Sequence, residues 1–69
     1  MEEIKLRDEF IKLGQALKAA GLVDSGVEAK IVITNCEVKV NGSVEIQRGK
    51  KLYDGDIVSF DGQEIKIVK

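Results

Sequence analysis

The 69-residue sequence predicts a small α+β protein in which two short helices pack on a small, twisted, mostly antiparallel sheet. Two observations lead to this fold class. Apolar residues recur with helical spacing in residues 13–20 and again in residues 29–36. Short segments that alternate apolar and polar residues then follow, separated by turn sequences such as Asn-Gly and Asp-Gly. We therefore expect two helices followed by a sheet of hairpins.

The first 21 residues contain one expected strand and one expected helix. Residues 2–6 alternate, with Ile4 and Leu6 on one side, and this pattern predicts a short edge strand. Residues 13–20 predict an amphipathic helix that ends before Gly21, because glycine commonly follows the last helical residue. The apolar positions i, i+3, i+4 and i+7 of this helix are Leu13, Ala16, Leu17 and Ala20.

The second helix has a specific start signal. Ser25 and Glu28 form a capping-box pair: the serine oxygen can accept from the Glu28 N–H, and the glutamate can reach back to the Ser25 N–H. The four β-branched residues 31–34 favour a strand by propensity. The helix is still preferred, because the propensity penalty is at most about 0.7 kcal/mol per residue and burial of an apolar face outweighs it.

The end of the second helix is expected at Asn35 or Cys36. Asn35 is the better candidate for the left-handed terminal residue, because asparagine tolerates that conformation. Cys36 continues the apolar face formed by Ala29, Val32 and Ile33, so we expect its side chain to be a buried small hydrophobe.

Two hairpins are expected in the second half. The first joins a strand at residues 38–40 to a strand at residues 44–47 through Asn41-Gly42, whose residues tolerate positive φ. The second joins residues 57–60 to residues 63–68 through Asp61-Gly62. Between the hairpins, Asp54-Gly55-Asp56 is a turn by composition.

Length and composition limit the possible roles. Residues 1–69 make one domain, which buries only about 60% of the surface of its unfolded chain. One cysteine and no histidine exclude an internal disulfide and a structural zinc site, and we expect no cofactor. The sequence has no apolar run of membrane-spanning length and no signal-peptide core, so we expect a cytoplasmic protein that does not contact membranes. We also expect a monomer.

The charge is unevenly distributed along the chain. The net charge is −1, but residues 1–10 and residues 54–69 each carry −2. Residues 11–53 carry +3, since seven lysine and arginine residues face four acidic residues. A small domain of this kind can present a basic face although its net charge is negative.

Several of these motifs together resemble the S4 RNA-binding domain, the alpha-L module first described in a small-subunit ribosomal protein. Within this family, the chain resembles most the small free-standing bacterial members, in which the module is the whole protein. The resemblance covers about residues 10–68. Cys36 stands where the family often has glycine, and Gln47 stands where close relatives tend to have a second arginine. The matching motifs are Lys12-Leu13-Gly14-Gln15-Ala16-Leu17, Ser25-Gly26-Val27-Glu28-Ala29-Lys30, Val38-Lys39-Val40-Asn41-Gly42, Arg48-Gly49-Lys50-Lys51-Leu52 and Gly55-Asp56-Ile57-Val58.

The resemblance implies binding to structured RNA, with ribosomal and tRNA-like RNA as candidates, through the helix pair and the adjoining basic loop. Phosphate contacts and RNA shape would then matter more than base edges. We expect Lys30 to lie on the same side of the molecule as the loop. The residues expected to bind RNA are Lys12, Lys18, Ser25, Lys30, Arg48, Gly49, Lys50 and Lys51.

Other functions fit the sequence less well. An enzyme is not expected, because there is no histidine, Ser25 is explained as a helix cap, and Asp54 and Asp56 fall short of a calcium loop. A ubiquitin-like carrier would need a C-terminal diglycine, and the chain ends in Ile-Val-Lys. The remaining alternative is a small protein-interaction subunit or adaptor that docks through an exposed sheet edge without direct RNA contact.

Overall fold

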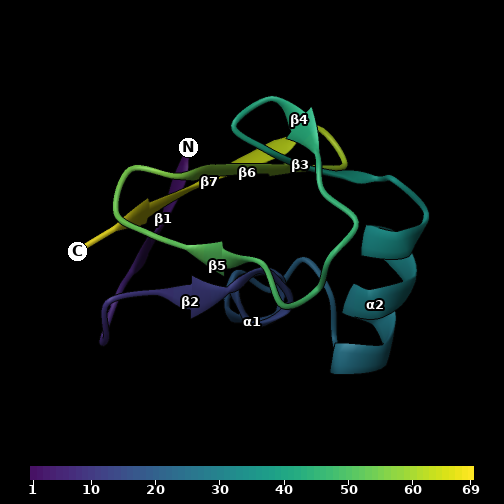
Figure 1. Cartoon of the computed structure of the whole chain (residues 1–69), viewed down its shortest axis with the longest axis horizontal. Coiled ribbons are helices and arrows are strands. Elements are labelled where there is room, and N and C mark those ends of the chain that lie inside the picture. Colours follow the sequence, from purple (N-terminus) through teal and green to yellow (C-terminus); the bar gives the residue numbers. More distant parts are fainter.

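The computed structural model describes all 69 residues and has the predicted α+β architecture (Figure 1). Its two helices and mostly antiparallel strands confirm the fold class. The elements in chain order are β1 (Glu2–Lys5), β2 (Ile11–Lys12), α1 (Leu13–Ala19), α2 (Gly26–Thr34), β3 (Val38–Val40), β4 (Ser43–Val44), β5 (Lys51–Leu52), β6 (Ile57–Phe60) and β7 (Gln63–Val68).

Five strands form one sheet in the order β1-β7-β6-β3-β4. All neighbours in this sheet are antiparallel except β1 and β7, which are parallel. The predicted first strand is therefore an edge strand. The separate ribbon of β2 and β5 is a feature that the sequence did not predict; it pairs Ile11 with Leu52 and Lys12 with Lys51.

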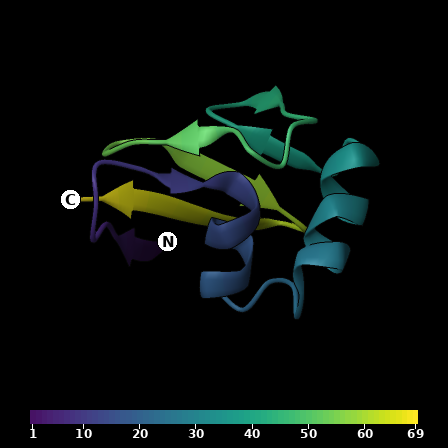
Figure 2. The same cartoon turned by 60° about the horizontal axis from the view of Figure 1, so that its bottom comes forward.

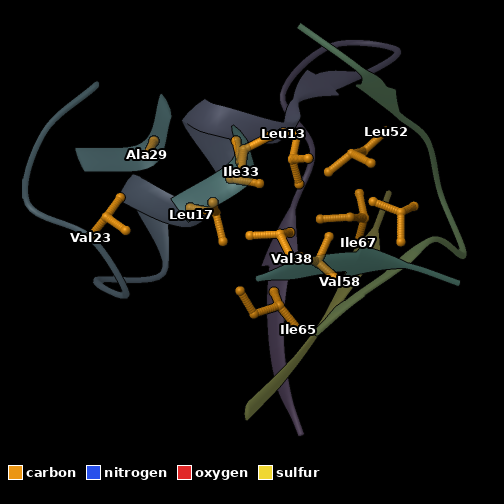
Figure 3. Close-up of a cluster of buried hydrophobic side chains, with 12 residues drawn as sticks. Leu13, Leu17, Val23, Ala29, Ile33, Val38, Leu52, Val58, Ile65 and Ile67 are labelled. Atoms are coloured by element: carbon orange, nitrogen blue, oxygen red, sulfur yellow. The ribbon is translucent and has the colours of Figure 1, made fainter. Parts of the chain in front are cut away.

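The core lies between the helices and the sheet (Figure 3). In Figure 2, α1 and α2 lie side by side, and both chain termini are at the end of the molecule away from α2. All the core residues are aliphatic, so the packing depends on shape and burial. The core residues are Leu13, Ala16, Leu17, Val23, Ala29, Ile33, Val38, Val40, Leu52, Val58, Ile65 and Ile67.

Helix α2 begins where the cap motif predicted. Ser25 is extended, and its Oγ accepts a hydrogen bond from the Glu28 N–H at 3.2 Å. Only this half of the capping box forms: the Glu28 side chain accepts no hydrogen bond from the Ser25 N–H. The cap and the burial of Ala29 and Ile33 together hold the β-branched segment in a helix.

The end of α2 corrects two expectations. Asn35 has a φ of −82°, and it is Cys36 that adopts the left-handed conformation, with a φ of +63°. The Cys36 N–H donates to Ile33 O at 3.2 Å, and the Glu37 N–H donates to Val32 O at 3.1 Å, which is the Schellman pattern. The reversal turns Cys36 out of the apolar face, so its side chain is exposed rather than buried.

The first hairpin is shorter than predicted. Asn41 and Gly42 form the expected turn, with φ values of +52° and +85°, but β4 ends at Val44 instead of reaching Gln47. The Glu45 carboxylate accepts a hydrogen bond from the Gln47 N–H at 3.1 Å, which bends the chain away from the sheet. Ile46 is 58% exposed, so no core contact holds this segment as a strand.

Candidate nucleic-acid interface

The loop between β4 and β5, residues 45–50, is fixed to the start of α1 (Figure 1), and we call it the basic loop. The Leu13 N–H donates to Lys50 O at 2.8 Å, and the Gly14 N–H donates to Arg48 O at 3.1 Å. Amides in the first turn of a helix have no partner within the helix, and the loop supplies carbonyls to two of them. The position of Arg48 is therefore determined by α1.

Gly14 allows the loop to approach this closely. The residue is buried, and a Cβ atom there would lie 2.7 Å from Arg48 Cγ and 3.3 Å from Arg48 Cδ. Gly14 is not among the residues that we expected from the sequence to bind RNA. A signal was present, because a glycine inside a predicted helix costs about 1 kcal/mol relative to alanine and so indicates a close contact.

Four of the eight predicted residues line one hollow of about 380 Å³. Its cations are Lys12, Lys18 and Arg48, and no apolar or acidic residue lines it. We call it the cationic hollow. Its other residues are Gly14, Gln15, Gly26 and Gly49, three of them glycines that let a ligand approach the backbone. Three cations without an acid can hold a phosphate, since charge-assisted hydrogen bonds to phosphate are among the strongest in proteins.

Lys50 and Lys51 line a different hollow, of about 370 Å³. Two acidic residues, Glu45 and Asp56, balance their charge there. We call this the mixed-charge hollow. Its remaining residues are Val40, Asn41, Ser43, Val44 and Tyr53. Arg48 and Gly49 of the basic loop therefore line the cationic hollow, whereas Lys50 of the loop and Lys51 of β5 line the mixed-charge hollow.

The two hollows meet at a pair of lysines. Lys12 lines the cationic hollow, Lys51 lines the mixed-charge hollow, and the two residues are direct partners across the β2–β5 ribbon. Side chains of directly opposite residues project from the same face with Cβ atoms roughly 5 Å apart. Both lysines are exposed, whereas Leu52 beside them is buried. This arrangement favours an anion at the junction, because it would relieve the repulsion between like charges.

Ser25 and Lys30 lie outside both hollows. Ser25 immediately precedes Gly26, and its Oγ is already bonded to the Glu28 N–H. Lys30 is exposed on α2, four residues after Gly26, which corresponds to a rise of about 6 Å along the helix. Lys30 is therefore near the cationic hollow along α2 but does not line it.

Two helices joined by a short connection and packed on a small mixed sheet, with a basic loop fixed to the first helix, define the alpha-L fold. The chain belongs to the S4 domain family, whose sequence model matches residues 4–68. None of its helices has the length and apolar character needed to cross a membrane.

The proteins similar to the chain include two relatives and one solved structure. RlbA of Bacillus subtilis, described as a probable ribosome maturation protein, is 44% identical over 59 residues, which cover 86% of this chain and 83% of RlbA. YbcJ of Escherichia coli, described as a candidate RNA-binding protein, is 40% identical over 84% of this chain and 83% of YbcJ. The solution structure of YbcJ, reported to have an alpha-L motif involved in RNA binding, covers 100% of this chain and 89% of its own with a TM-score of 0.77 and 36% identity.

Proposed function

We propose that residues 1–69 act as one monomeric RNA-binding module in the cytoplasm, which docks on structured RNA and performs no catalytic step. The names of the two relatives, an RNA-binding protein and a ribosome maturation protein, support this class of function. The observation that carries the proposal is the cationic hollow. Lys12, Lys18 and Arg48 converge there although the chain as a whole is acidic.

The chemistry of the hollow suits an RNA backbone. Its cations come from three separate places: β2, α1 and the basic loop. The hydrogen bonds from Leu13 and Gly14 to the loop hold these elements together before any ligand arrives. Because the backbone of these elements is already fixed, RNA binding has to order only the three side chains. Such cations recognise the spacing of phosphates rather than the identity of bases.

The remaining predicted residues would extend this surface. Lys30 would contact a phosphate beyond the hollow along α2, whose first N–H groups beside Ser25 also favour an anion. Gly49 would let the RNA backbone approach the loop. Lys50 and Lys51 would contact RNA on the other side of the loop, in the mixed-charge hollow.

Charge reversal with a matched control tests the proposal. The bound RNA is first identified by crosslinking in cells and sequencing, and its affinity is then measured for the wild type and for paired variants. We expect Lys12→Glu with Lys18→Glu to lower affinity roughly 100-fold, because two charge-assisted contacts are worth about 3 kcal/mol together. Lys50→Glu with Lys51→Glu should also weaken binding, while the free energy of unfolding changes by no more than about 0.5 kcal/mol.

The control is Lys39→Glu with Lys66→Glu, which changes the net charge equally. Both residues are exposed on sheet strands, and their buried neighbours Val38 and Ile67 point to the core. These lysines therefore lie on the outer face of the sheet. We expect this variant to bind RNA like the wild type. Equal affinities for the control and the Lys12/Lys18 variant would rule out the cationic hollow as the RNA site.

The alternative is a protein-interaction subunit or adaptor, and one observation favours it. The outer edge of β1 is unpaired, and a hollow of about 570 Å³ lies beside it. Half of the residues that line this hollow are apolar, among them Ile4, Leu6 and Phe10, and the other half are polar or charged. A protein strand could pair with this edge. Purification from RNase-treated extract distinguishes the two functions: a stoichiometric protein partner that survives the treatment supports the adaptor, and loss of every partner contradicts it.

A further inference from the structure

Tyr53 is a large aromatic residue held in an exposed position. It is 48% exposed and follows β5 directly. Its backbone is fixed on both sides: the Tyr53 N–H donates to Asp56 Oδ2 at 2.8 Å, and the Asp56 N–H donates to Tyr53 O at 3.0 Å. The other oxygen of Asp56 accepts a hydrogen bond from the Asn41 side-chain amide at 3.0 Å. The Tyr53 ring therefore extends from a rigid base.

A second aromatic ring and a cation lie beside it. The centroids of the Tyr53 and Phe10 rings are 6.1 Å apart, with an angle of 52° between the ring planes. The Lys51 ammonium lies 4.8 Å from the Phe10 centroid, within cation–π range. The Phe10 ring thus lies beside Tyr53, and Tyr53, which is partly exposed, also lines the mixed-charge hollow.

The charges of the mixed-charge hollow suit an uncharged polar ligand better than a phosphate. Its two lysines are balanced by Glu45 and Asp56, and both carboxylates already accept backbone hydrogen bonds. The cationic hollow, in contrast, has three cations and no acid. A nucleobase is flat and uncharged, has polar edges, and stacks on aromatic rings, so it matches the mixed-charge hollow.

The two hollows are adjacent through the Lys12–Lys51 pair. An RNA backbone held in the cationic hollow would therefore bring neighbouring nucleotides to Tyr53. We propose that Tyr53 is a stacking site for one unpaired RNA base, placed beside the phosphate contacts of the cationic hollow. The inference rests on the proposed RNA-binding function and adds a preference for RNA that has an unpaired nucleotide next to a structured region.

Two RNA probes and two variants test the inference. The first probe is a hairpin RNA with a blunt stem end, and the second is the same hairpin with three unpaired adenosines at each end. We expect the wild type to bind the tailed hairpin roughly 5- to 100-fold more tightly, since stacking of one base on an aromatic residue has that effect. Tyr53→Leu should lose this preference and keep its affinity for the blunt hairpin. Tyr53→Phe should keep the preference, because it retains the ring.

Fluorescence provides a measurement that needs no variant. Tyr53 is the only tyrosine and the chain has no tryptophan, so tyrosine emission reports on this ring alone. We expect the tailed hairpin to quench the emission at saturation and the blunt hairpin to leave it nearly unchanged. Unquenched emission with the tailed hairpin would overturn the stacking site.

The outcomes separate this inference from the proposed function. If the wild type binds both hairpins equally, or if Tyr53→Leu still prefers the tailed hairpin, the stacking site is wrong and RNA binding stands. If the wild type binds neither hairpin, and no RNA is crosslinked to it in cells, the RNA-binding function fails and the stacking site fails with it. Thermal unfolding of each variant shows whether a loss of binding reflects a loss of folding.

Discussion

Lys12 and Lys51 lie directly opposite each other across the β2–β5 ribbon, so that two positive charges share one face of a two-residue pairing. Like charges in such a position are destabilising. Neither residue is needed for the core, because both are exposed. An anionic ligand between the two lysines would offset their repulsion, and this leads to a prediction in which stability and binding change in opposite directions.

Lys12→Glu should raise the free energy of unfolding and lower RNA affinity. An opposite-charge pair with Lys51 would replace the repulsion, and for an exposed pair we expect a gain of about 0.5 kcal/mol at low salt. Urea unfolding measures the gain, and titration with RNA measures the loss. The control is Lys39→Glu, because Lys39 faces Ser59 and Val44 in the sheet and has no lysine opposite. A stability gain at both positions would show that the Lys12–Lys51 repulsion is not its cause.

Gly14→Ala should weaken RNA binding without unfolding the protein. The new Cβ would lie 2.7 Å from Arg48 Cγ, so the exposed Arg48 side chain must move away from its present position. Alanine also has a higher helix propensity than glycine, which offsets part of the local crowding. We expect the free energy of unfolding to change by less than about 1 kcal/mol.

Gly26→Ala is the matched control for this change. Gly26 lines the same hollow, but a Cβ atom there meets nothing within 4 Å. We expect Gly26→Ala to retain RNA affinity while Gly14→Ala loses it, in direct titrations at the same salt concentration. Retained affinity in both variants would show that the placement of Arg48 does not matter for binding.

Asp56→Ala should destabilise the fold by about 1–3 kcal/mol. The carboxylate accepts hydrogen bonds from the Asn41 side chain and from the Tyr53 N–H, and its loss would leave both donors without this partner. Asp54→Ala is a control in the same turn, since that carboxylate accepts only from the N–H of the terminal residue Lys69. We expect the control to lose no more than about 0.5 kcal/mol in urea unfolding. Similar losses at both positions would contradict a special role for the link to Asn41.

Local sequence signals predicted most of the fold. The Ser25 cap located the start of α2, and the Asn41-Gly42 and Asp61-Gly62 turns located both hairpins. These features depend on residues within a few positions of one another, where backbone preferences decide the structure. The Gly55-Asp56 motif matched the family, but the sequence did not show what Asp56 does in the fold. In the structure, the Asp56 carboxylate accepts a hydrogen bond from the side chain of Asn41, fifteen residues away.

The features that the sequence did not predict depend on tertiary contacts. The attachment of Arg48 and Lys50 to α1 joins segments more than thirty residues apart, and no local pattern encodes it. That attachment also divides the basic cluster, so that Arg48 and Lys51 line different hollows. The shorter β4 has a similar origin: alternation favoured a longer strand, but no apolar surface covers Ile46.

Cys36→Gly should stabilise the protein. Cys36 has a φ of +63°, a conformation that costs a residue with a side chain roughly 1–2 kcal/mol and costs glycine almost nothing. Glycine also has more conformational freedom in the unfolded chain, which offsets part of this benefit. We therefore expect the free energy of unfolding to rise by about 0.5–1 kcal/mol. The exposed Cys36 side chain loses no core contact on removal. The matched variant is Asn35→Gly, which should destabilise, because Asn35 has a φ of −82°. Chemical unfolding of both variants in reducing buffer measures the difference.

RNA affinity should fall with salt at a slope set by the cationic hollow. Three phosphate contacts, one from each of its cations, give a log–log slope of about −2, since each contact to a single strand contributes roughly −0.7. A further phosphate contact from Lys30 would steepen the slope toward about −3. Lys18→Gln removes one contact and should make the slope shallower by about 0.7, while Lys39→Gln on the sheet should leave it unchanged. Affinities measured between 50 and about 300 mM salt give these slopes. Equal slopes for Lys18→Gln and the wild type would mean that Lys18 makes no phosphate contact. The cationic hollow would then hold RNA through Lys12 and Arg48 alone.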